Sequence, residues 1–167
     1  MIGIKAAGNR PARLPGMGER EVGLLVQSAL QRAAEQLGDI TPAVARQFAA
    51  AMPAGFALFH HHEPLDPARL EGAMVEQALH CLMHWHDSPG EIEIMLISTL
   101  PHHVETLGVS HDVFAQYLVT VCAVIAGTIP PDARDEQSAW QRMLDDLLEV
   151  IARGASYARP DLARRAG

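Results

Sequence analysis

The chain has 167 residues, a formal net charge of −7 at pH 7 and 49% hydrophobic residues. This length suits one domain with a single core, and the composition is typical of a globular protein rather than a disordered one. An acidic chain without a basic stripe is a poor electrostatic match for nucleic acid or anionic lipid. We therefore expect neither a nucleic acid nor a membrane as a partner.

The first twenty residues contain no apolar run, and no segment of the sequence is long enough to span a membrane. The two cysteines, Cys81 and Cys122, lie in apolar helical stretches and need no disulfide bond. A reducing cytoplasm is therefore the expected location.

Apolar spacing and helix start and stop residues predict the elements. Residues 1–17 are expected to form a flexible arm, residues 18–156 the domain and residues 157–167 a flexible tail. A first helix ends at Gly38. A second begins at Thr41-Pro42, where the threonine side chain would cap the helix, and it ends at Pro53. Residues 54–59 are predicted to form a short turn and residues 60–64 a loop.

In the second half, Asp66-Pro67 starts a helix and Ser110 caps a later one. The segment 91–106 between them is predicted to be helical but irregular, with Pro101 bending it. A last helix follows Pro130-Pro131. The sequence therefore predicts an all-α single domain of about seven helices.

The chain contains no glycine-rich phosphate loop, no paired CxxC motif and no nucleophile elbow. No protein-based catalytic constellation is visible, which leaves open whether the protein is an enzyme. The nine histidines are the unusual feature of the composition.

Two histidine groups have ordinary explanations as well as metal-binding ones. Glu76, His80 and His84 are spaced four apart, so two of them could ligate one metal ion from a single helical stripe. A solvated polar face explains the same spacing. The run His60-His61-His62 could bind a divalent metal ion or simply form a polar loop.

His103 is different because helical spacing places it with Leu96, Leu100 and Leu107, whereas His102 points elsewhere. An imidazole framed by leucines faces the core, where it must be hydrogen-bonded or ligated. Either a backbone carbonyl or a metal ion would satisfy it.

Three segments follow one another in a characteristic order. The first segment runs from Ile40-Thr41-Pro42-Ala43-Val44 through Phe48 to Met52-Pro53, and Phe59 follows six residues later. In the second segment, His103 precedes Leu107-Gly108-Val109 and then Val113-Phe114. The third is Trp140, which lies early in the last helix. In this order, over about residues 20–152, the chain resembles the globins, and among them the bacterial single-domain and sensor-type globins.

The resemblance implies a globin-like fold that binds heme, with His103 as the iron ligand and Phe59 packed on the macrocycle. It implies a diatomic gas (O₂, CO or NO) as the partner, and a homodimer through the last two helices. Met143 and Val150 lie beside the core stripe of the last helix, where they either supply a second apolar contact or form the edge of the core. The remaining walls of the heme pocket would be Leu70, Met74, Leu96, Leu100, Leu107, Val113 and Tyr117.

Two departures from the globin pattern accompany the resemblance. Four residues rather than three separate His103 from Gly108, so either the helix end bulges or the iron ligand is lost, since strict register puts Val104 at that position. The far side of the pocket matches Leu70, or Arg69 if the alignment shifts by one, and Met74. That side is therefore expected to lack a hydrogen-bond donor.

Three functions remain open from the sequence. The first is a heme-binding globin-like protein that binds a gas or acts as a redox or gas sensor, in which His60, His61 or His62 could supply a second iron ligand. The second is a heme-free globin-fold signalling or interaction module. The third is a non-heme metal-binding helical protein that uses Glu76, His80 and His84.

Overall fold

The computed structural model describes residues 17–157, and the arm and tail expected at the two ends of the chain lie almost entirely outside this range. The described residues form seven α-helices and one π-helical turn, with no strand among them, so the predicted all-α single domain is confirmed. The elements are α1 (Glu19–Leu37), α2 (Thr41–Ala51), α3 (Pro53–His62), α4 (Pro67–His84), α5 (Pro89–Pro101), η1 (His102–Thr106), α6 (His111–Ala126) and α7 (Arg134–Tyr157).

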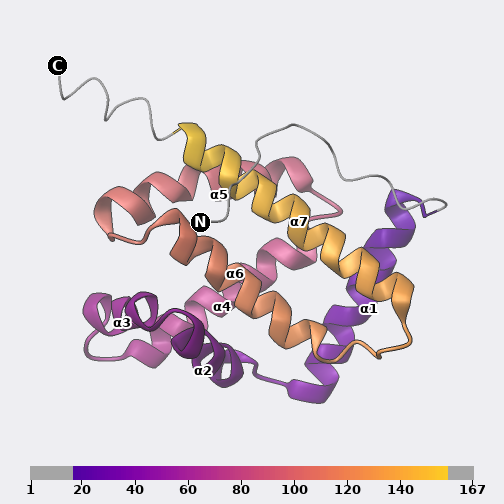
Figure 1. Cartoon of the computed structure of the whole chain (residues 1–167), viewed down its shortest axis with the longest axis horizontal. Coiled ribbons are helices and arrows are strands. Elements are labelled where there is room, and N and C mark those ends of the chain that lie inside the picture. Colours follow the sequence, from indigo (N-terminus) through magenta and orange to yellow (C-terminus); the bar gives the residue numbers. More distant parts are fainter. Residues whose placement is uncertain (1–16, 158–167) are drawn as a thin grey trace, which may run out of the picture.

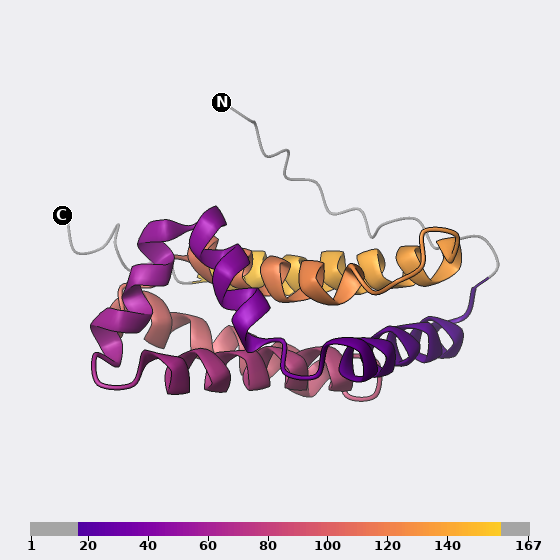
Figure 2. The same ribbon diagram turned by 90° about the horizontal axis from the view of Figure 1, so that it is seen from below.

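The helices form two layers, as Figures 1 and 2 show. Helices α6 and α7 lie in one layer, α1, α4 and α5 lie in the other, and α2 and α3 cross between the layers at one end. Helix α7 packs against α1 and α5, and α6 packs against α7, α2, α1 and α4. This arrangement encloses α6 and brings residues from α3, α4 and α5 to its N-terminal half.

Two of the three predicted helix caps are confirmed. An oxygen of Asp66 accepts a hydrogen bond from the Arg69 amide at 3.1 Å, and Ser110 Oγ accepts one from the Val113 amide at 3.3 Å. The expected Thr41 cap is wrong, because Thr41 already lies inside α2. Its amide instead donates to Asp39 Oδ1 at 2.9 Å, so the aspartate supplies the acceptor.

The predicted turn and loop after Pro53 are also wrong, because residues 53–62 form one continuous helix. Phe56 and Phe59 pack against the core, and the helix continues through His62 until the Glu63 amide bonds to the Phe59 carbonyl at 2.9 Å. Tertiary burial of one face therefore overrides the polar character of the three histidines.

The last helix is more deeply enclosed than expected. Trp140 is buried and its indole donates to the Cys122 carbonyl at 3.2 Å, while Arg32 of α1 pairs with the buried Glu136. Met143 and Val150 are 0% and 1% exposed within this one chain. Of the two alternatives for these residues, the core position is confirmed, because α1, α5 and α6 cover that side of α7.

Membrane-spanning character is not found in the described residues: none of their helices is long and apolar enough to cross a bilayer.

The contact between α5 and α7 depends on the small size of Gly154. A Cβ atom at this position would lie 2.5 Å from Leu100 Cδ1, whereas a Cβ at Gly72 of α4 would meet nothing within 4 Å. We expect Gly154→Ala to lower the free energy of unfolding by about 1–2 kcal/mol through overpacking. Gly72→Ala should raise it by about 0.5–1 kcal/mol, because alanine is the better helix former. Urea denaturation followed by circular dichroism measures both, and equal effects would contradict the close approach of α5 and α7.

Candidate functional site

An apolar cavity of about 270 Å³ lies between α3, α4, α5, η1 and α6. Phe48 of α2 also lines it, so the cavity collects residues from six elements that are far apart in the sequence. Eight of the nine residues expected at a ligand site line it: Phe59, Leu70, Met74, Leu96, His103, Leu107, Val113 and Tyr117.

Leu100 is the expected residue that does not line the cavity. It is 0% exposed and lies on the side of α5 that faces α7, where its Cδ1 would meet a Cβ on Gly154. Leu96 and Leu100 are one turn apart on α5, so helical spacing predicts that they share a face. Spacing alone therefore could not tell that Leu96 borders the cavity and that Leu100 packs against α7.

Several cavity residues were not expected from the sequence. Phe48, Cys81, Met95, Thr99, Phe114 and Leu118 belong to this group. Apolar periodicity marks most of them as core residues without telling which core positions border a void. The Cys81 thiol is buried, which raises its pKa to about 11 and keeps it neutral at neutral pH.

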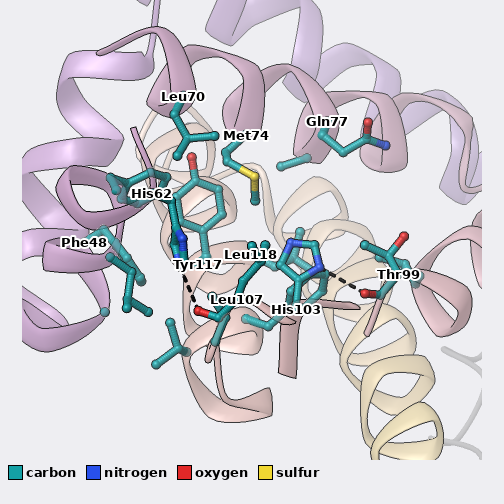
Figure 3. A pocket seen from close by; sticks show the side chains of 18 of the residues that line it. Phe48, His62, Leu70, Met74, Gln77, Thr99, His103, Leu107, Tyr117 and Leu118 are labelled. Carbon is teal, nitrogen blue, oxygen red and sulfur yellow. Dashed lines mark hydrogen bonds between the residues drawn. The ribbon is translucent and has the colours of Figure 1, made fainter. Parts of the chain in front are cut away.

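The ring of His103 is held in a defined tautomer. Its Nδ1 lies 3.0 Å from the Thr99 carbonyl oxygen, and since a carbonyl only accepts, Nδ1 carries the proton. In the neutral form of the ring Nε2 then carries the lone pair, and Figure 3 shows this nitrogen facing into the cavity. Phe114 contacts the ring edge to face, with centroids 5.0 Å apart. His102 is exposed, as expected.

The π-helical turn η1 accommodates the additional residue between His103 and Gly108. The Leu107 amide bonds to the His102 carbonyl at 3.2 Å, five residues back, and the Val109 amide bonds to the His103 carbonyl at 2.8 Å. Such a turn inserts one residue without unwinding the helix before it. Of the two alternatives from the sequence, the helix end bulges, and His103 rather than Val104 lines the cavity.

Of the three consecutive histidines, only His62 lines the cavity, whereas His60 and His61 are exposed. His62 Nε2 donates to the Leu107 carbonyl at 2.7 Å and so joins the end of α3 to the residue after η1 (Figure 3).

The lack of a hydrogen-bond donor on the far side stays a prediction. Tyr117 of α6 is 8% exposed, and its hydroxyl is buried with no hydrogen-bond partner. Figure 3 shows the hydroxyl on the side of Leu70, beneath α4. Burial raises the pKa of this phenol well above its ordinary value, so the hydroxyl remains protonated.

The stripe of Glu76, His80 and His84 lies on the exposed face of α4. The rings of His80 and His84 are close, with centroids 4.5 Å apart. Within residues 17–157, however, no three histidine, cysteine or acidic side chains gather closely enough to hold a metal ion. The structure therefore favours the solvated polar face.

Comparison of the chain with protein families, with curated proteins and with solved structures finds no match.

The hydrogen bond from His62 should stabilise the contact between the end of α3 and Leu107, the residue after η1. We expect His62→Ala to lower the free energy of unfolding by about 1 kcal/mol, since it removes a hydrogen bond to a backbone carbonyl. His61→Ala is the matched control, because His61 is exposed and should change stability by less than about 0.5 kcal/mol. Equal losses in thermal or urea denaturation would show that the His62 contact is not formed in solution.

Proposed function

We propose that the protein is a globin-like protein that binds heme in this cavity and takes a diatomic gas as its ligand. One observation carries the proposal: the imidazole of His103, whose Nδ1 bonds to a backbone carbonyl, presents its Nε2 to an apolar cavity. Neutral imidazole is a common metal ligand and the usual axial ligand of heme in globins.

The surroundings of His103 fit this role. A metal-ligating histidine almost always donates its other ring nitrogen to a carbonyl, carboxylate or water, which fixes the ring and increases its basicity. The Thr99 carbonyl makes this contact, and Phe114 packs against the ring. Among residues 17–157 no three histidine, cysteine or acidic side chains gather to hold a metal ion, which favours heme, with its single histidine ligand, over a multi-ligand metal ion.

The walls of the cavity fit a flat apolar macrocycle. Phe59, Leu96, Leu107 and Val113 contribute only carbon, and the exposed Gln77 at the margin shows that the cavity reaches the surface. Globin helices likewise pack pairwise around a heme pocket, and the two layers seen here leave their cavity between α4 and η1.

When bound, heme would supply an iron atom with a position open to O₂, CO or NO. His103 would hold the macrocycle from the side of η1, and the Thr99 carbonyl would keep the imidazole oriented. Phe59 and Leu107 would exclude water from the ring faces. Binding would thus depend on positions fixed by α3, η1 and α6 together.

The alternative is a heme-free globin-fold module whose cavity holds another apolar molecule. It shares the cavity but does not use the Nε2 lone pair of His103, and that nitrogen separates the two proposals.

Hemin titration of the purified protein is the test, with absorbance read before and after desalting. We expect a retained Soret band in the parent protein, loss of tight retention in His103→Gly, and recovery of the axially ligated spectrum when imidazole is added. His102→Ala is the control and should retain heme like the parent, because His102 is exposed. A colourless parent protein after desalting would contradict heme binding and favour the heme-free module. Equal loss in both variants would show that His103 is not the specific ligand.

A further inference from the structure

A groove between α1 and α4 shares no residue with the cavity beside His103. It has a volume of about 330 Å³ and lies between the second half of α1, the connection to α2, the middle of α4 and the end of α6. Leu30 and Ala34 line it from α1, and Gly72, Val75 and Leu79 line it from α4. Ala34 is exposed and a Cβ on Gly72 would meet nothing within 4 Å, so the groove is open to a partner.

Exposed apolar side chains continue this groove along both helices. Helical spacing places Leu24 on the same stripe of α1 as Ala34, and Met83 lies one turn beyond Leu79 on α4. The two helices are joined there, because Gln27 Nε2 donates to the Met83 carbonyl at 3.1 Å. Leu37 lies at the other end of the groove, one turn after Ala33. Leu24, Leu37 and Met83 are all exposed. Together with the groove, these three side chains form a surface that we call the α1–α4 face.

The part of this face that α1 supplies carries little charge. Between Val22 and Leu37 the exposed residues are Leu24, Gln27, Ser28, Gln31, Ala34, Glu35, Gln36 and Leu37, of which Glu35 alone is charged. The exposed residues of α7 before Tyr157, by contrast, include the charged Arg134, Asp135, Asp145, Glu149 and Arg153. Because charged residues are depleted in the centre of protein interfaces and occur at their rims, this composition is typical of an interface.

The charge of the chain favours a second copy as the partner. At a net charge of −7, two copies repel each other wherever their carboxylates meet, so they approach at low electrostatic cost where charges are few. A basic partner would instead be attracted to acidic positions such as Asp145 and Glu149 of α7. A contact between identical faces also requires a receiving groove and inserting side chains on one surface, and the α1–α4 face has both.

The area of the face is sufficient for such a contact. Helix α1 has 19 residues and is therefore about 28 Å long, and two adjacent helices span about 20 Å. The face thus offers about 500 Å² on each chain. Two copies would bury about 1,000 Å² in total, which is the lower limit for a specific interface.

We propose that two copies of the chain associate through their α1–α4 faces around a two-fold axis, with the exposed apolar side chains of each copy over the groove of the other. This places the dimer contact on α1 and α4 rather than on the last two helices, where the resemblance implied it. The cavity beside His103 takes no part, so the proposal does not depend on heme binding.

Sedimentation velocity of the full chain tests the proposal over about 1–100 µM protein, because dimer formation depends on concentration. We expect the parent protein to approach twice the 18.1 kDa mass of one chain. Ala34→Glu should raise the dimer dissociation constant at least tenfold, or about 1.4 kcal/mol, because the contact would remove an unpaired carboxylate from water. Leu24→Glu should act in the same way, and it decides the test if circular dichroism shows that Ala34→Glu does not fold.

Ala152→Glu is the matched control. Ala152 is exposed on α7, so this variant adds the same charge to another helix and should dimerise like the parent. Equal weakening by glutamate at positions 34 and 152, or weakening at 152 alone, would overturn the proposal, because the contact would then not be specific to the α1–α4 face. A parent that stays monomeric, or whose mass keeps rising beyond two chains, would overturn it as well.

Discussion

Burial of α6 is the constraint on which the rest of the structure depends. Seven of its sixteen residues are buried, and it contacts helices of both layers. An isolated helix of this length is marginal in water, so its stability comes from the faces that other helices cover. Because Ser110 fixes where α6 begins, it also fixes which side chains turn toward the cavity and which turn toward the core. The N-terminal half borders the void, and the C-terminal half is packed solid against α7 and α1.

The cavity exists because two close approaches hold the surrounding helices in place. A Cβ on Gly55 would lie 2.9 Å from Val113 Cγ1, so only glycine lets α3 come this near to α6. Gly154 has the same effect where α7 meets α5. These contacts fix the two ends of α5 and α3, and η1 then turns the chain from one layer to the other. Four residues separate His103 from Gly108, and the π-helical turn formed there leaves the ring of His103 directed toward the cavity.

The polar groups of the residues around the cavity differ in whether they have a hydrogen-bond partner. His103 donates to the Thr99 carbonyl, which also accepts the His102 amide, and His62 donates to the Leu107 carbonyl. Tyr117 lies too far inside the aromatic cluster of Phe48 and Phe59 to find such a partner. Its hydroxyl therefore has no hydrogen-bond partner among the described residues.

The sequence by itself determined the helical class, most helix limits and eight of the residues around the cavity. Apolar spacing and the start residues Asp66 and Ser110 are local signals, and they need no knowledge of the fold. Spacing also placed His103 on an inward face, because its position relative to the leucines of the same helix depends only on the helical repeat.

Only the tertiary structure decided how the helices share their inward faces. It extended α3 through His62 by burying Phe59, directed Leu100 to α7 rather than to the cavity, and enclosed Met143 and Val150 within the chain. It also formed the π-helical turn after His103 and left the Tyr117 hydroxyl without a partner among the described residues. Each of these outcomes depends on a neighbour far away in the sequence, and periodicity along one helix carries no information about that neighbour.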